Sequence, residues 1–245
     1  MRVIALGASN LTRGLRTVAS MSRAQWGRDT QVIAALGLGR SYGERSRLLV
    51  RSLPGIRQCG IWNALDAAPQ EESIGLISDV GNDILYGYPP ERILEWVDEA
   101  ITRLQRHAGT VVVAGLPAHS AAQLTPRRFR VMRAVMFPSS DQTFDGARQS
   151  VTVVQAGVER LAAQRGLRFV PMLPDWYGWD PIHFRYRYWR RFWGDMLGTD
   201  PALWTASPEP GGLRESVRLW LRADEHRWIC GVHQYTKQKG RIQLF

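Results

Sequence analysis

Four short segments of the sequence carry residue types that can perform nucleophilic catalysis. Ser9 follows a short apolar run, Asn82 lies in a Gly-Asn-Asp segment, and Asp180 precedes His183 by three residues. A carboxylate near a histidine can orient the imidazole as a general base toward a serine hydroxyl. An asparagine amide and the backbone N–H of a turn glycine such as Gly39 can stabilise the oxyanion on an attacked carbonyl. The set therefore predicts acyl transfer to a serine.

Each segment also has an ordinary structural interpretation. A serine between a strand and a helix is a common helix N-cap, and Asn and Asp are common turn residues. The glycines around Gly39 nearly match a dinucleotide-binding fingerprint, but the third glycine comes one residue late. A carboxylate three residues before a histidine is often just a polar residue on the protein surface. The catalytic interpretation therefore requires a fold that brings the four segments together.

Short apolar runs alternate with segments of helical period along the chain, a pattern typical of βαβ units around a parallel sheet. The predicted strands are Val3–Leu6, Gln31–Leu36, Ile74–Val80, Thr110–Leu116 and Leu167–Met172, and the predicted helices include Leu11–Ala19, Ile93–Leu104 and Gly146–Arg165. We therefore expect an α/β fold of three αβα layers around a five-stranded parallel, flavodoxin-like sheet. Ligands bind beyond the carboxyl ends of such strands, and all four segments follow predicted strands.

These segments, in this order, resemble the SGNH (GDSL-like) hydrolase superfamily, which is named for the Ser, Gly, Asn and His of four sequence blocks. The matching segments are Gly7-Ala8-Ser9-Asn10, Gly39, Gly81-Asn82-Asp83 and Asp180-x-x-His183. The resemblance implies a three-layer domain over residues 1–205 that hydrolyses an ester with a serine. Ala8 stands where the family usually has an acid, and Gly43 is an alternative to Gly39 in the second block.

The resemblance also implies a role for each residue. Ser9 would attack the acyl carbon, His183 would carry the proton, and Asp180 would stabilise the imidazolium. The backbone N–H groups of Ser9 and Gly39 and the side chain of Asn82 would form the oxyanion hole. This mechanism requires no metal and no organic cofactor.

Further residues are candidates for contact with the substrate, namely Asp83, His119, Trp176, Trp179 and Arg187. His119 is also a rival general base, although no carboxylate lies near it in the sequence.

The segment Phe184–Leu197 has helical spacing and two distinct faces. Its aromatic and aliphatic stripe contains Trp189, Phe192, Trp193, Met196 and Leu197, and its basic face contains Arg187, Arg190 and Arg191. The stripe predicts a face that packs against the sheet. Because the predicted helix begins one residue after His183, its arginines would lie near the rim of the site. With Trp176, Tyr177 and Trp179, they predict a pocket with aromatic walls and a basic edge that suits an anionic substrate.

The composition narrows the functional classes. The 245 residues include 32 Lys and Arg against 22 Asp and Glu, a net charge of +10 that favours anionic partners. The two cysteines exclude a disulfide framework. The chain shows neither a signal-peptide core nor an apolar run long enough to span a membrane, so we expect a cytoplasmic protein. The catalytic interpretation predicts a small-molecule ester as its substrate. Nucleic acid is not the expected partner, and the oligomeric state stays open.

Two regions and two alternative functions complete the sequence interpretation. Residues 54–72 and 117–145 match no regular element, and the second range is a candidate lid. Residues 206–245 form an expected C-terminal extension with a Pro/Gly break at Pro208–Gly212, a helix over Leu213–Leu221 and a hairpin within Arg227–Phe245. An acyltransferase with the same triad and a catalytically impaired binding module for anionic ligands are the alternative functions.

Overall fold

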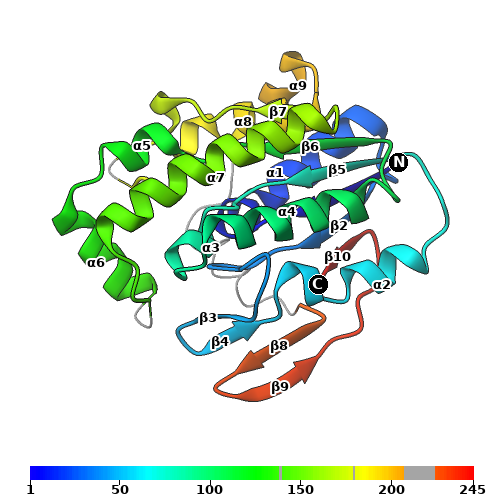
Figure 1. Ribbon diagram of the computed structural model, residues 1–245. Helices are drawn as coiled ribbons and strands as arrows, with labels where there is room; N and C mark the ends of the chain where they lie inside the picture. The colour runs from blue at the N-terminus through cyan, green and yellow to red at the C-terminus, as the bar shows by residue number, and fades with distance from the viewer. Residues whose placement is uncertain (138–139, 179, 207–223) are drawn as a thin grey trace.

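A parallel sheet of six strands forms the centre of the protein. The computed structural model describes residues 1–137, 140–178, 180–206 and 224–245 (Figure 1). The strand order is β10-β2-β1-β5-β6-β7. The strands are β1 (Arg2–Leu6), β2 (Gln31–Ala35), β5 (Ser73–Ile77), β6 (Thr110–Ala114), β7 (Arg168–Val170) and β10 (Ile242–Leu244). All five predicted strands are confirmed, and β10 adds a sixth that pairs in parallel with β2.

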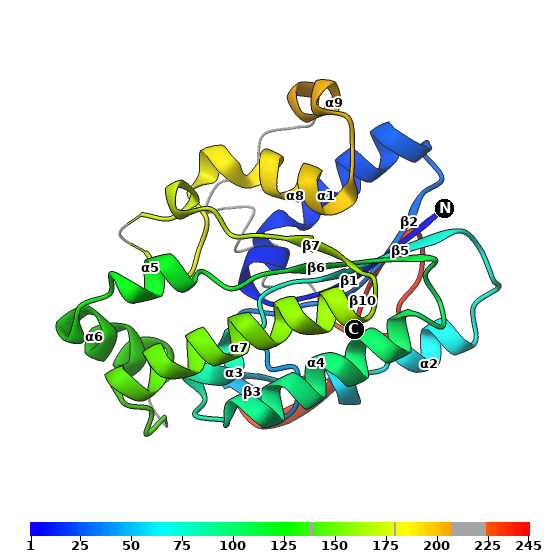
Figure 2. The same ribbon diagram turned by 45° about the horizontal axis from the view of Figure 1, so that its top comes forward.

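Helices cover both faces of this sheet, as the three-layer prediction requires. Alternate residues of β1 enter two separate cores, because successive strand side chains point to opposite faces. Ile4 and Leu6 lie in a core with α4 (Pro90–Leu104) and α7 (Phe144–Gln164), whereas Val3 and Ala5 face α1 (Ser9–Trp26) and α8 (Trp189–Leu197). Figure 2 shows these helix pairs on opposite sides of the strands.

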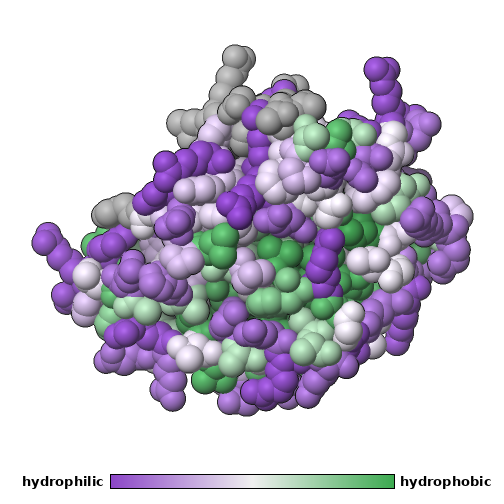
Figure 3. All heavy atoms as spheres, turned by 90° about the horizontal axis from the view of Figure 1, so that it is seen from above, coloured by the Kyte–Doolittle hydropathy of each residue, from purple (hydrophilic) through white to green (hydrophobic). Residues whose placement is uncertain are grey.

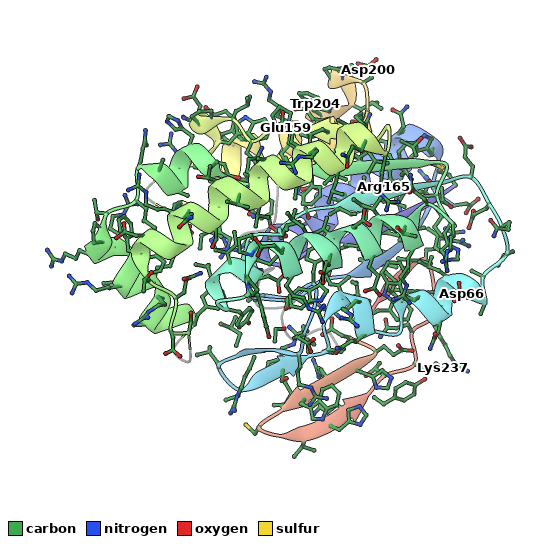
Figure 4. The ribbon with its side chains drawn as sticks, in the orientation of Figure 1. Asp66, Glu159, Arg165, Asp200, Trp204 and Lys237 are labelled. Atoms are coloured by element: carbon green, nitrogen blue, oxygen red, sulfur yellow. The ribbon has the colours of Figure 1, made fainter. Side chains whose placement is uncertain are left out.

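The three long predicted helices are present, with clear local causes for their ends. Pro90 occupies the first turn of α4, and the Thr143 side chain caps α7 by accepting a hydrogen bond from the Gly146 N–H. Arg165, labelled in Figure 4, follows the last residue of α7 and forms an ion pair with Asp98 of α4. In the view from above, apolar side chains gather in the middle of the face and hydrophilic ones surround them (Figure 3).

Two ranges without predicted elements contain helices, so that part of the prediction was wrong. Residues 54–72 include a 3₁₀ turn at Ile56–Gln58 and α2 (Ile61–Asp66). Residues 117–145 include α5 (Ala118–Ala122), α6 (Pro126–Met136) and the start of α7. Helix α5 is short and α6 is rich in arginine, so both lack the long apolar stripe that identifies a helix in a sequence.

A small antiparallel sheet lies beside the main one, with the strand order β3-β4-β8-β9. It joins β3 (Ser46–Leu48) and β4 (Arg51–Leu53) to β8 (His226–Ile229) and β9 (Val232–Tyr235). The hairpin expected within residues 227–245 is therefore β8–β9, but the chain then returns to the main sheet as β10. The predicted break at Pro208–Gly212 and helix over Leu213–Leu221 lie outside the described residues, and the domain boundary near residue 206 stays a prediction.

In the described part of the chain, no helix combines the length and apolar character needed to cross a membrane.

Candidate active site

Ser9, His183 and Asp180 form a continuous series of hydrogen bonds at the carboxyl edge of the main sheet. Ser9 is the first residue of α1, which begins three residues after β1 ends. Its Oγ lies 2.9 Å from His183 Nε2, and His183 Nδ1 lies 2.6 Å from Asp180 Oδ2. Ser9 and His183 are only 3% and 7% exposed. The hydroxyl thus faces an imidazole whose other nitrogen is held by a carboxylate, as a nucleophile and its base require.

Asp180 is held in its ionised form. Burial raises the pKa of this carboxyl, but the hydrogen bond and charge of His183, together with the backbone N–H groups of Ile182 and His183, lower it to about 2. Asp180 Oδ1 accepts from these two N–H groups at 3.0 and 3.2 Å. The carboxylate therefore stays charged at every pH at which an esterase is normally assayed, and it can stabilise an imidazolium.

The candidate oxyanion donors come from three chain segments near Ser9. Gly39 has φ = +66°, a conformation that few other residues adopt without strain, and the Tyr86 hydroxyl donates to its carbonyl at 2.7 Å. Asn82 is buried at the start of a short helix, α3 (Asn82–Leu85), and its Nδ2 donates to the Arg40 carbonyl at 3.2 Å. These contacts hold Asn82 beside the glycine loop, and its assignment as an oxyanion donor is a proposal.

Asp83, a candidate for substrate contact, is fully buried and instead ties the glycine loop to α3. Its carboxylate accepts hydrogen bonds from the Ser41 hydroxyl and, at 2.8 Å, from the Tyr42 N–H. Burial raises the pKa of Asp83 to about 7, although these hydrogen bonds oppose the shift. The side chain thus acts on the loop that carries Gly39.

Replacing Asp83 with Asn should change how stability depends on pH. The folded protein holds a proton on Asp83 up to about pH 7, whereas the unfolded chain releases it near the ordinary value of 3.8. The folded state therefore binds more protons between these values, and its stability falls as the pH rises through them, by on the order of 4 kcal/mol for this group. We expect the free energy of unfolding, measured by urea titration from pH 4 to 8, to fall less steeply with pH in Asp83→Asn than in the wild-type protein. An equal fall in both proteins would contradict the assignment.

Asn10 and Asp79 form a second hydrogen-bonded pair, which was not predicted from the sequence. Asp79 Oδ2 accepts from the N–H groups of Ala8 and Leu11 at 2.7 and 3.1 Å, and Oδ1 accepts from Asn10 Nδ2 at 2.7 Å. Asp79 therefore supplies a carboxylate to the turn in which Ala8 replaces the usual acid. The backbone of Asp79 has φ = +62°, which is uncommon for a residue other than glycine. Strand β5 ends at Ile77, before the predicted residue 80.

Asn10 also connects the serine turn to the histidine loop. Its Nδ2 donates to the Ile182 carbonyl at 3.2 Å, and its Oδ1 accepts from the Phe184 N–H at 3.4 Å. These two residues flank His183, so the Asp79–Asn10 pair orients the loop that carries the imidazole. In the sequence, only position indicated these two residues: Asn10 directly follows Ser9, and Asp79 lies two residues before Gly81.

An apolar pocket of about 100 Å³ opens beside these residues. Asn82, Asn10, Asp79 and Ile182 line its end near the triad, and Arg148 is the other charged residue on its wall. The rest of the wall is apolar and comes largely from α3, α5, α6 and α7, with Ile84, Leu116, Leu124, Phe129, Met132, Phe144 and Val151 among its residues. The range predicted as a lid, 117–145, therefore supplies much of this wall.

The structure also describes three of the other candidates for substrate contact. Trp176 is buried in the core, with its ring 6.0 Å from Phe184 and 5.8 Å from Phe192, rather than at the rim. His119 is exposed and hydrogen bonded to Gln123 at 2.8 Å. Arg187 is exposed, 4.8 Å from the ring of its neighbour Tyr188. Trp179 lies outside the described residues.

The helix after His183 begins later than predicted. α8 starts at Trp189, six residues after His183, and a 3₁₀ turn at Tyr186–Tyr188 precedes it, so Arg187 is not part of the helix. The predicted core stripe is confirmed, because all five of its members are buried. Residues 183–185 connect the triad to the 3₁₀ turn without helical structure, and the stripe packs only from Trp189 onward.

Nothing in the described residues forms a cluster of three His, Cys, Asp or Glu side chains that would hold a metal ion.

Comparison with known proteins supports the fold. No protein-family model and no curated protein sequence matches the chain. Three similar solved structures are a member of the lipolytic G-D-S-L family from Veillonella parvula, a carbohydrate acetylesterase family member from Sinorhizobium meliloti, and the native aryl esterase of M. smegmatis. Their sequence identities are 14, 16 and 17%, and their TM-scores are 0.51, 0.53 and 0.50. The alignments cover 81, 80 and 84% of this chain and 97, 95 and 98% of those chains. The expected resemblance to SGNH hydrolases is thus confirmed at the level of the fold.

Proposed function

We propose that the protein is a serine esterase of the SGNH type, with Ser9, His183 and Asp180 as its triad. The observation that carries this proposal is the hydrogen-bonded series from Asp180 through His183 to Ser9 beside an apolar pocket that Asn82 lines. Comparable folds in the aryl esterase and the acetylesterase family member support it.

The reaction proceeds in two halves. Ser9 Oγ attacks the acyl carbon while His183 Nε2 takes its proton, and the carbonyl oxygen becomes an oxyanion held by Asn82 and the N–H groups of Ser9 and Gly39. His183 then gives the proton to the leaving alcohol, which leaves an acyl ester on Ser9. Water attacks this ester with His183 as base, and the acid and free Ser9 are regenerated.

The pocket suits an apolar acyl group. Its wall is aliphatic and aromatic except near the triad and at Arg148, so a chain of several methylene groups would be removed from water there. A separate polar pocket shares Tyr177 and Pro181 with the apolar one and is lined by Arg128 and Arg185. Asp175 also lines this pocket, but the two arginines leave it with a net positive charge, and this supports a substrate with an anionic leaving group.

A series of p-nitrophenyl esters from acetate to decanoate tests the proposal. We expect kcat/KM to rise with chain length until the pocket is filled, since each buried methylene contributes about 0.8 kcal/mol. Labelling by a fluorophosphonate should occur in the wild-type protein and be lost in Ser9→Ala. Absence of both hydrolysis and labelling in the wild-type protein would refute the proposal and favour a binding module.

Narrowing the pocket should change the chain-length preference. Leu124 lines the pocket, is partly exposed and packs at the edge of the core, so Leu124→Trp should narrow the pocket with little change to the core. We expect kcat/KM for octanoate to fall by about tenfold and that for acetate to change little, because the loss of room for two methylenes corresponds to roughly 1.6 kcal/mol. Val153→Trp, at an exposed position of α7, is the matched control. If Leu124→Trp lowered kcat/KM equally for both esters, the acyl group would bind outside this pocket.

A further inference from the structure

Large apolar side chains are unusually exposed at two adjacent turns of the small sheet. Leu49 and Val50 form the β3–β4 turn and are 73 and 46% exposed, and Val232, at the start of β9, is 65% exposed. We refer to these three residues as the hairpin-tip patch. Exposed apolar residues that gather in this way usually mark an interaction site.

The two turns are held side by side. Arg51 of β4 pairs with Ile229 of β8, and the Cys230 N–H donates to the Val50 carbonyl at 2.8 Å. Both tips point to the left of the small sheet in Figure 1, the direction in which the strands of the main sheet run. The patch is therefore a joint surface of two chain segments that are about 180 residues apart in the sequence.

The backbone of both turns has positive φ values. Leu49 has φ = +53° and Cys230 has φ = +49°, a region in which glycine or asparagine is comfortable and a bulky side chain is strained. The tip thus carries a solvent-exposed leucine in a conformation that leucine disfavours. Tight hairpin turns require positive φ, so the turn itself accounts for the backbone, but glycine or asparagine would satisfy it at Leu49 with less strain and without an exposed apolar side chain.

The strands that carry the tips are rich in arginine. Residues 45–53 and 226–235 contain four arginines and no Asp or Glu, while Glu44 and Glu225 directly precede the two ranges. Arg45 and Arg47 are exposed, and the Arg45 guanidinium lies 3.8 Å from the centre of the Trp228 ring. Figure 4 shows Lys237 at the end of the small sheet opposite the tips, so the positive charge near the patch comes from the arginines. The nearby Asp224 is buried and paired with Arg51. The surface therefore complements an anionic one.

We propose that the hairpin-tip patch docks on the surface of a membrane that contains anionic lipids. Leu49, Val50 and Val232 would enter the boundary between headgroups and acyl chains, while Arg45 and Arg47 would contact lipid phosphates. Exposed aliphatic side chains next to arginines are the combination that such surfaces bind.

The alternative anionic partner, single-stranded nucleic acid, fits the surface less well. Binding of bases requires open aromatic faces. Here the Trp228 and His233 rings pack on each other with centroids 4.6 Å apart, and His226 Nδ1 is hydrogen bonded to His233 Nε2 at 3.0 Å. Tyr235 is 59% exposed, but it ends β9 and so lies away from the tips. The most exposed side chains of the tips are aliphatic, and these do not stack on bases.

Cys230 makes a direct test possible without a mutation. Cys59 is buried and Cys230 is exposed beside the patch, so a polarity-sensitive thiol dye should label Cys230 selectively, and Cys230→Ser provides the labelling control. On phosphatidylcholine vesicles with 30% phosphatidylglycerol we expect a blue shift of the dye and co-sedimentation of the protein. No shift and no co-sedimentation would overturn the proposal.

Variants separate the apolar and the charged contributions. Leu49→Asn/Val232→Thr keeps residues that suit the backbone, and it should lower the partition coefficient by about tenfold through lost apolar burial. The control variant Val131→Thr/Val153→Thr, at exposed positions of α6 and α7, should leave the partition coefficient unchanged. Arg45→Gln/Arg47→Gln should lower binding to the anionic vesicles by roughly 10- to 30-fold and spare neutral ones.

Hydrolysis of p-nitrophenyl acetate provides an independent readout. The Leu49→Asn/Val232→Thr variant should keep the wild-type rate with this soluble ester, so a failure of docking and a failure of the esterase proposal can be distinguished. Equal vesicle binding by this variant and the wild type would overturn the proposed contact. Salt-sensitive binding to a single-stranded oligonucleotide without binding to vesicles would assign the surface to nucleic acid instead.

Discussion

Ser9→Ala is expected to lower kcat for a small activated ester by about 10⁴- to 10⁶-fold, because the residue that forms the covalent bond to the acyl group is lost. His183→Ala should have a similar effect, since His183 Nε2 lies 2.9 Å from Ser9 Oγ and is the base that takes its proton. The double variant should be no worse than either single one, because the two residues act as a unit. Initial rates with p-nitrophenyl butyrate give these values.

The fold of the Ser9→Ala variant must be shown to be intact. Ser22 is also a buried serine of α1, and its hydroxyl donates to the Val18 carbonyl at 2.7 Å. Ser22→Ala is therefore a matched control that removes a buried hydroxyl far along the same helix, and it should keep near-wild-type kcat. A well-folded Ser9→Ala variant with full activity would refute the mechanism.

Asp180→Asn should lower kcat by about 10⁴-fold while leaving KM nearly unchanged. The neutral amide can present its N–H₂ to His183 Nδ1, which favours the wrong tautomer and leaves Nε2 unable to accept the serine proton. An imidazolium would also lose its counter-charge. Because the pKa of Asp180 is about 2, protonation of this carboxyl does not contribute to any loss of wild-type activity above pH 4.

Asp66→Asn is the control for this change. Asp66 is a 70% exposed acid at the end of α2, where it lies 3.1 Å from Nε2 of another histidine, His107. Its replacement alters the net charge equally, so it should reproduce any general electrostatic effect but not the loss of kcat. If both variants lost activity to the same extent, Asp180 would have no specific role at His183.

Local sequence patterns determined the sheet and the candidate triad. Apolar runs such as Val3–Leu6 are buried on both faces in a parallel sheet, so they are recognisable without tertiary information. Parallel strands end at a common edge, and for this reason the order of Ser9, Asn82 and His183 after successive strands was enough to expect them together. The likeness of Asp180-x-x-His183 to a known block strengthened that expectation.

Contacts between distant segments decided what the sequence did not reveal. β10 pairs with β2 about 210 residues away in the sequence, and Asp79 reaches Ala8 across the sheet edge, so no local period marks either contact. The start of α8 was misplaced because the helical spacing continues through Phe184–Tyr188, while the chain must first turn away from His183. The hairpin-tip patch likewise exists only because β4 and β8 pair, and this pairing places two unremarkable turns side by side. Spacing along the chain specifies which residues share a face, whereas long-range pairing specifies which faces meet.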